Sequence, residues 1–263
     1  MRSRDPLGAA LDTALAIAYD AGRFTLGHFR AGVRPEFKAD DSPVTVADRG
    51  AEELIRGRLR AAFPDDGVLG EEFGDEPGSS GRRWLVDPID GTKSFVRGVP
   101  LYSVLLALEE EGAVTAGVAY FPALDEMVYA ARGRGAYLDG RRIAVADTPD
   151  LARAFVSCTD PGSFERHGRG DAWRRLQAAS YMRVGWGDAY GHALVASGRV
   201  ELMCDPALKP WDGGPFGVIL PEAGGYFGDW AGNGTVHGGE GISTTRTLLP
   251  EVLARIRGED GGA

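Results

Sequence analysis

The sequence predicts a protein of mixed α and β structure built from two lobes. From Leu7 to Phe29, large apolar residues and alanines recur at helical spacing. Between Tyr102 and Val145, apolar segments are separated by turn sequences such as RGRG, which is typical of an antiparallel meander. Beyond Thr148, short apolar segments alternate with helical stretches, as in α/β proteins. We therefore expect an α+β lobe over residues 1–148 and an α/β lobe over residues 149–263.

Local patterns predict individual elements within these lobes. The sequence TVAD, Thr45–Asp48, has the form of a capping box and should open a second helix. The apolar run Trp84–Val86 predicts a buried strand that stops at Asp87. The second lobe should contain short strands at Phe155–Ser157, Met182–Val184 and Glu201–Cys204.

Composition and charge exclude several classes of function. A net charge of -9 with scattered Lys and Arg leaves no basic stripe for a nucleic acid. The two cysteines, Cys158 and Cys204, lack the spacing of a zinc site, so we expect buried thiols. No stretch of about twenty apolar residues is present, so we expect a cytoplasmic protein that does not enter a membrane.

Two carboxylates follow the predicted strand at 84–86. Asp87 and Asp90 flank Pro88 and Ile89, and the proline stiffens the turn so that carboxylates and carbonyls can converge on one point. Magnesium prefers such oxygen ligands. The alternative is an exposed turn in which the acids only cap the next segment.

Further carboxylates stand at two other expected element ends. Glu71 and Glu72 follow the apolar pair Val68 and Leu69. They are either metal ligands at the end of a neighbouring strand or part of a charged loop. Asp212 opens a helical segment that runs on toward Glu222. Asp212 itself is either a metal ligand or an ordinary N-cap of that helix.

The order and spacing of TVAD, GEE, DPIDGT and WD followed by EAGG resemble the inositol monophosphatase family, from about Lys38 to Gly225. The resemblance implies a layered αβαβα fold, usually dimeric, that hydrolyses a small phosphate monoester with two or three Mg2+ ions. A bound cation also suits an acidic protein that acts on phosphate, because it inverts the local field. Because members of the family are usually dimeric, the resemblance also implies a homodimer.

The resemblance also assigns roles to residues. It implies one metal held by Glu71, Asp87 and the Ile89 carbonyl, and a second held by Asp87, Asp90 and Asp212. Thr92 and Asp48 would orient the attacking water, and Glu71 would assist catalysis. The backbone amides of Gly91 and Thr92 would bind phosphate.

Two segments are more similar to the histidinol-phosphate phosphatase branch of that family. They are Gly91–Glu109, where Lys93 replaces a usual threonine, and Arg183–Pro206. Histidinol phosphate carries cationic groups, which acidic side chains would complement. The residues expected to bind it are Arg183, Gly185, Trp186, Gly187, Asp188 and Asp205. Core packing is the alternative for Trp186, and helix capping is the alternative for Asp188.

Other functions stay open at this point. Within the family, the rival substrates are inositol monophosphate, fructose 1,6-bisphosphate and 3'-phosphoadenosine 5'-phosphate. A metal-dependent ligand-binding protein without turnover is a different class, and a glycosidase that uses two carboxylates is a third. The four histidines show no metal-pair spacing, so we expect none of them to be catalytic, and we expect His28 to be structural.

Overall fold

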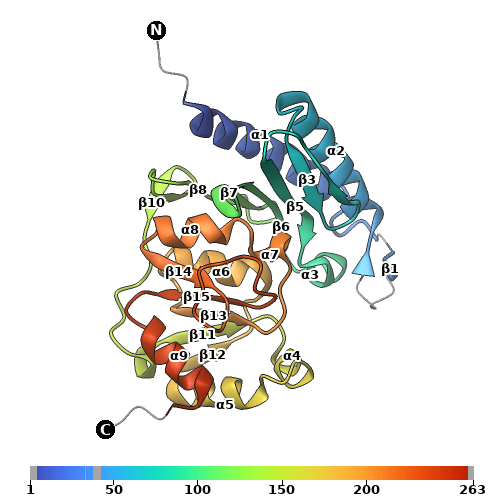
Figure 1. Cartoon of the computed structure of the whole chain (residues 1–263). Helices are drawn as coiled ribbons and strands as arrows, with labels where there is room; N and C mark the ends of the chain where they lie inside the picture. Colours follow the sequence, from blue (N-terminus) through green and yellow to red (C-terminus); the bar gives the residue numbers. More distant parts are fainter. Residues whose placement is uncertain (1–4, 33, 38–42, 260–263) are drawn as a thin grey trace.

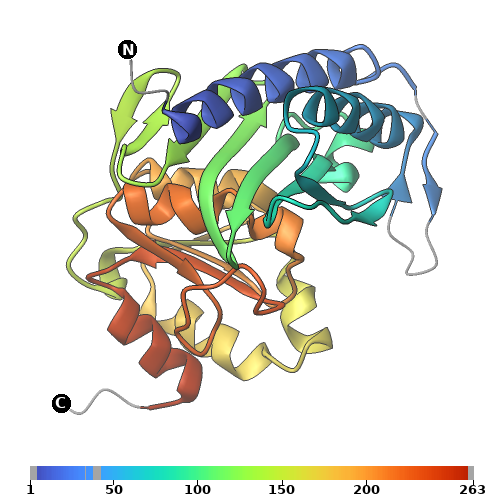
Figure 2. The ribbon, with the colours of Figure 1, turned by 45° about the horizontal axis from the view of Figure 1, so that its top comes forward.

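The chain forms five layers in the order helix, sheet, helix, sheet, helix (Figures 1 and 2). The structure is a computed structural model that describes residues 5–32, 34–37 and 43–259. The outer layers are α1 and α2 on one side and α4, α5 and α9 on the other, with α6 and α8 between the sheets. The expected layered αβαβα fold is confirmed.

The first helical layer matches its sequence signals with one change of length. Helix α1, Pro6–Leu26, ends before the predicted limit at Phe29. Phe29 instead contacts the rings of Phe95 and Tyr102 in a small separate core. Helix α2, Val46–Ala62, opens with the predicted capping box: Ala47 N donates to Thr45 Oγ1, and Thr45 N donates to Asp48 Oδ2.

An eight-stranded sheet packs beneath these helices in the order β10-β9-β8-β7-β6-β5-β3-β4. The strands from β5 to β10 pair as successive antiparallel neighbours, so the predicted meander is confirmed. Strand β3 is parallel to β5, which puts the ends of the two strands side by side. The strands are β3 (Gly67–Gly70), β4 (Gly74–Glu76), β5 (Arg82–Asp90), β6 (Ser103–Glu110), β7 (Ala113–Phe121), β8 (Glu126–Ala131), β9 (Ala136–Leu138) and β10 (Arg141–Ile143).

Strand β5 differs from its prediction at the position that carries the carboxylates. It does not stop at Asp87 but continues to Asp90. Asp87 faces Leu105 and Asp90 faces Ser103, so β5 holds one residue more than its partner here and forms a bulge. Pro88 lies inside this bulge, where its missing N–H costs no ladder hydrogen bond.

The second sheet has five strands in the order β12-β11-β13-β15-β14. Three of them confirm the predicted short strands to within a residue, and Cys158 and Cys204 are both buried, as expected. The strands are β11 (Phe155–Cys158), β12 (Met182–Val184), β13 (Leu202–Asp205), β14 (Gly225–Gly228) and β15 (Gly241–Thr245). The helices around it are α4 (Pro161–Arg166), α5 (Gly170–Ala179), α6 (Asp188–Ala196), α8 (Phe216–Glu222) and α9 (Leu249–Arg257).

One apolar core joins the two sheets. It contains Leu105 and Phe121 of the first sheet, Met203 and Phe227 of the second, and the buried side of α8. The division into lobes at residues 148 and 149 therefore stays a prediction. The remaining elements are short: β1 (Glu36–Phe37) pairs with β2 (Pro43–Val44), and α3 (Thr92–Val96), η1 (Leu151–Arg153) and α7 (Pro210–Gly213) are single turns or little more.

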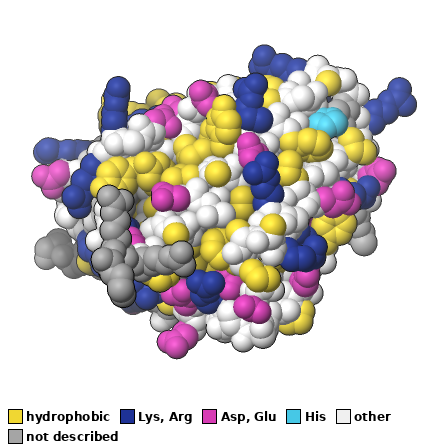
Figure 3. All heavy atoms as spheres, turned by 90° about the horizontal axis from the view of Figure 1, so that it is seen from above, with side chains coloured by type: hydrophobic (Ala, Val, Ile, Leu, Met, Phe, Trp, Pro, Cys, Tyr) yellow, Lys and Arg dark blue, Asp and Glu magenta, His cyan; other side chains and the backbone are white. Residues whose placement is uncertain are grey.

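The outer surface over α1 and α2 carries charges of both signs. Figure 3 shows Lys and Arg side chains interspersed with Asp and Glu among apolar atoms. The ion pair Arg58–Asp20, 2.7 Å long, links the two helices there. Within the described residues, no helix is long and apolar enough to cross a membrane.

The contact between α1 and β7 predicts the effect of filling Gly22. An added Cβ would lie 2.5 Å from Tyr120 Cδ1, and Tyr120 is buried and held through its hydroxyl by Asp125. Gly22→Ala should therefore destabilise the protein by about 1–3 kcal/mol. Gly57→Ala on α2 is the matched control, because nothing lies within 4 Å of its added Cβ. It should stabilise by about 0.5–1 kcal/mol. Urea unfolding of both variants measures the difference, and equal effects would contradict the prediction.

Candidate metal centre and adjoining cavity

Three carboxylates meet where β5 bulges and α7 packs against it. Asp87, Asp90 and Asp212 each offer one oxygen, and these oxygens lie within 4.8 Å of one another. Asp212 is the third residue of α7 and accepts a hydrogen bond from Lys209 N at 2.9 Å, so it is not the N-cap. The structure thus brings together acids that are more than a hundred residues apart.

Glu71 reaches the same place from the neighbouring strand. Its N–H donates to the Val86 carbonyl at 3.2 Å, which fixes the end of β3 beside β5. The charge of Glu71 raises the pKa of both Asp87 and Asp212. Glu71 therefore comes from a strand that neighbours β5, as predicted, and the structure adds that the two strands are parallel.

The electrostatics of the cluster are those of a cation site. Burial raises the pKa of Asp87 well above its usual range, and the charges of Glu71 and Asp90 raise it further. Burial and then the charge of Asp188 do the same to the pKa of Asp90. Burial raises the pKa of Asp212 to about 7. Carboxylates crowded in this way favour either protons or a multivalent cation, and their oxygens suit a hard ion such as Mg2+.

Asp48, Thr92 and Ile89 form a second group next to these acids. The Thr92 hydroxyl lies 3.3 Å from Asp48 Oδ1 and 3.1 Å from the Ile89 carbonyl, and it can donate to either. Asp48 is itself held by Thr45, whose hydroxyl donates to Asp48 Oδ2 at 2.5 Å. Burial raises the pKa of Asp48. The structure therefore places both predicted water-orienting residues together with the expected carbonyl ligand.

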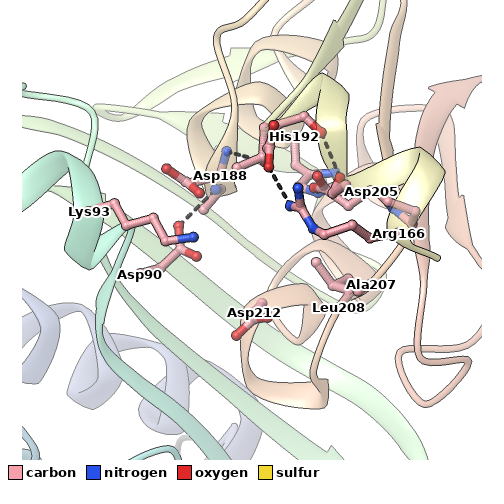
Figure 4. Close-up of a pocket in the computed structure, with 14 residues that line it drawn as sticks. Asp90, Lys93, Arg166, Asp188, His192, Asp205, Ala207, Leu208 and Asp212 are labelled. Atoms are coloured by element: carbon pink, nitrogen blue, oxygen red, sulfur yellow. Dashed lines mark hydrogen bonds and ion pairs between the residues drawn. The ribbon is translucent and has the colours of Figure 1, made fainter. Parts of the chain in front are cut away.

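A cavity of about 170 Å3 opens beside the cluster (Figure 4). Its walls carry five aspartates but only two basic residues, and one of these, Arg166, is paired with Asp160 at 2.5 Å. The charged residues of the wall are Asp90, Lys93, Asp160, Arg166, Asp188, Asp205 and Asp212. The cavity therefore favours a ligand with positive charge, and an anion requires cations in the site.

Asp188 and Asp205 are the two predicted substrate residues that line this cavity. Asp188 begins α6 with φ 51°, and its N–H donates to Thr159 Oγ1 at 2.8 Å. Gly187 rather than Asp188 is the N-cap of α6, so the capping alternative is wrong. The Ser94 hydroxyl lies 3.5 Å from its carboxylate, and burial raises its pKa to about 6.

The other four predicted substrate residues do not line the cavity. Arg183 lies on the edge strand β12 and donates to the Ser180 carbonyl at 3.1 Å. Trp186 is 44% exposed, so the core-packing alternative for it is also wrong. An added Cβ on Gly187 would lie 2.8 Å from Thr159 N, so this glycine serves close packing, while Gly185 has open space beside it. A part for these four residues in substrate binding stays a prediction.

Sequence reasoning missed His192 as a cavity residue. No catalytic role was expected for it, yet its ring lines the cavity and contacts Asp205. A signal was present, because His192 follows Asp188 by four residues and the two share one face of α6.

A buried ion pair on α2 braces the loop that carries Glu71. Glu52 Oε2 accepts a hydrogen bond from Glu72 N at 2.7 Å, and Oε1 accepts one from Phe73 N at 3.3 Å. Arg56 Nε donates to Glu52 at 2.8 Å, and Arg56 Nη2 donates to the Gly74 carbonyl at 2.5 Å. Glu52 is fully buried, so both charges depend on each other and on this loop.

Comparison with known proteins decides the family. The model of the inositol monophosphatase family matches residues 9–259. The chain belongs to that family. A histidinol-phosphatase of Chlorobaculum parvum is 45% identical over 94% of this chain and 96% of its own length. A histidinol-phosphatase of Mycobacterium tuberculosis is 39% identical over 92% and 96%. The crystal structure of the extragenic suppressor protein suhB from Bartonella henselae superimposes with TM-score 0.88 at 27% identity, covering 95% of this chain and 98% of that one.

The inositol monophosphatase family membership defines the class of reaction. The protein is a phosphatase, that is, a phosphoric monoester hydrolase, and its substrate is a small phosphate ester. Members of the family are metal-dependent, and the cluster of Asp87, Asp90 and Asp212 is the described group of acids that fits this requirement.

The raised pKa of Asp212 predicts how the metal-free protein responds to pH. The carboxyl group titrates at about 7 when folded and near 3.8 when unperturbed, so folding takes up a proton between these values. This contribution to stability is present at low pH and is lost as pH rises toward 7. Asp212→Asn removes this pH-dependent contribution. In EDTA, the melting temperature of the variant minus that of wild type should therefore rise between about pH 5 and about pH 7.5, a range that lies largely within the interval between the two pKa values. A difference that does not change with pH would contradict the assignment.

The Glu52–Arg56 pair predicts a loss of metal affinity without a change of any ligand. Glu52→Gln loosens the Glu71 loop and should weaken Mg2+ binding by about 10-fold or more. Glu53→Gln is the matched control, because Glu53 is the exposed neighbour on the same helix. Calorimetric titration of both variants with Mg2+ is the measurement. Equal affinities in the two variants would show that the brace does not position the site.

Proposed function

We propose that the protein hydrolyses L-histidinol phosphate to L-histidinol and phosphate with Mg2+, as a step of histidine biosynthesis. The observation that carries this proposal is the strongly acidic cavity that adjoins the carboxylate cluster. A phosphate group needs cations at the cluster, and a cationic remainder of the substrate suits the aspartates beyond it. Histidinol phosphate combines both properties in one small molecule.

The donor set supports two or three Mg2+ ions. Glu71, Asp87 and the Ile89 carbonyl would hold one ion, and Asp87, Asp90 and Asp212 a second. When bound, the ions would lower the pKa of a water molecule and offset the charge of the phosphoryl oxygens. All the proposed donors are oxygens, which is the preference of Mg2+ rather than of softer metals.

The residues around the ions would orient the reactants. Thr92 and Asp48 would hold the attacking water, whose oxygen bonds to phosphorus as the ester P–O bond breaks and the alcohol departs with a proton. The Thr92–Asp48 contact of 3.3 Å supports this pairing. The amides of Gly91 and Thr92 would bind the phosphate, and Gly91 has the positive φ of 79° that opens α3 there.

The remainder of the substrate would lie against Asp188 and Asp205. Both line the cavity, and their negative charges would complement the cationic groups of histidinol phosphate. A neutral polyol substrate would not require charged side chains at these positions. The relatives named histidinol-phosphatase, at 45% and 39% identity, support the same choice. We also propose a homodimer and a cytoplasmic location, as the family resemblance implies. Family membership sets aside the glycosidase alternative. The intact set of water-orienting and metal-ligating residues argues against the non-catalytic alternative; it comprises Asp48, Glu71, Asp87, Asp90, Thr92 and Asp212.

A substrate panel tests the proposal. Purified protein should release phosphate from histidinol phosphate with a higher kcat/KM than from inositol monophosphate, fructose 1,6-bisphosphate or 3'-phosphoadenosine 5'-phosphate, and EDTA should abolish all of it. Asp188→Ala should lower kcat/KM for histidinol phosphate by about 10-fold or more, and for inositol phosphate by less. Asp171→Ala, an exposed aspartate on α5, is the control. Activity in EDTA, or a preference for inositol phosphate, would refute the proposal.

A further inference from the structure

His192 is a buried polar residue to which the proposed reaction gives no role. Its side chain is 1% exposed, and its ring packs against Phe216 and Phe227 at centroid distances of 5.1 and 5.6 Å. The two ring nitrogens nevertheless have specific polar partners. Nδ1 lies 2.7 Å from Ser243 Oγ on β15, and Nε2 lies 3.2 Å from Asp205 Oδ2 on β13.

The direction of these hydrogen bonds follows from the chemistry of the groups. An ionised carboxylate only accepts, so the proton on the Asp205 side belongs to Nε2. In the neutral ring Nδ1 is then the acceptor, and the Ser243 hydroxyl donates to it. The Asp205 carboxylate therefore selects the tautomer with the proton on Nε2, and the Ser243 hydroxyl completes the arrangement by donating to Nδ1.

The carboxylate of Asp205 is held by His192 alone among the residues that the structure describes. Trp230 Nε1 donates to the backbone carbonyl of Asp205 at 3.2 Å, which holds the strand but not the side chain. The carboxylate lines the cavity, and its Oδ1 receives no hydrogen bond from the described residues. Figure 4 shows His192 and Asp205 at one end of the cavity, with Asp90 and Lys93 at the other.

We propose that His192 is a positioning residue for substrate selection: it holds one oxygen of Asp205 so that the other faces the cationic group of the substrate. The inference rests on the proposed function, because it requires a substrate with such a group. It predicts an effect on KM rather than on kcat, since Asp205 is not among the proposed metal ligands or the residues proposed to orient the attacking water.

Two substitutions separate positioning from packing. The amide nitrogen of Gln can take the place of Nε2, so His192→Gln should keep KM for histidinol phosphate within about twofold of wild type. His192→Asn reaches only the Nδ1 position, so it should raise that KM by about 10-fold and leave kcat within about twofold. KM for glycerol 2-phosphate, which has no cationic group, should not change in either variant.

A double-mutant cycle tests whether His192 acts through Asp205. Adding His192→Asn to Asp205→Asn should cause no further rise of KM, because the group that His192 positions is already altered. Ser243→Ala should raise KM for histidinol phosphate by a smaller factor, and it answers the question if His192→Asn does not fold. Equal losses on both substrates, or additive effects in the cycle, would overturn the inference. A wild-type enzyme without preference for histidinol phosphate would instead refute the proposed function, whatever the variants do.

Discussion

The mutual repulsion of buried carboxylates is the constraint on which the rest of the site depends. When they are ionised, the carboxylates repel one another, but the backbone holds each of them in place. This applies to Asp87, Asp90 and Asp212. The bulge in β5 fixes two of them, and the first turn of α7 fixes the third through Lys209 N. Rigid scaffolding of this kind is what gives a cation site its affinity, because the ion relieves a repulsion that the fold has already imposed.

The layered architecture explains why the acidic site has two distinct ends. The first sheet and α7 supply the crowded acids, while β13 and the start of α6 supply Asp205 and Asp188. The cavity lies where these elements face one another across the central helical layer. One end can therefore be charged for phosphate chemistry and the other for recognition. The two ends are nevertheless linked, because Ala189 N at the start of α6 donates to Asp90 Oδ2 at 2.8 Å.

Local signals in the sequence predicted most of the elements and the order of the acidic motifs. The capping box at Thr45, the meander after Tyr102 and the strand pair that brings Glu71 beside Asp87 were all foreseen. The bulge was not, since an extra residue in β5 is visible only against the register of β6. Ser243, His192 and Asp205 could not be grouped either, because they lie on three elements that only tertiary packing brings together. The core-packing alternative for Trp186 was wrong, because large aromatic residues are usually buried whereas this one is exposed.

The buried pair of Glu52 and Arg56 has a consequence for how this protein can evolve. A pair of apolar residues of similar volume can be as stable as such an ion pair, yet losing one partner first leaves an uncompensated buried charge. Either single substitution therefore lowers the stability of the protein until a second substitution restores it. We therefore expect the two positions to change together or not at all during evolution, even where an apolar pair would be equally stable.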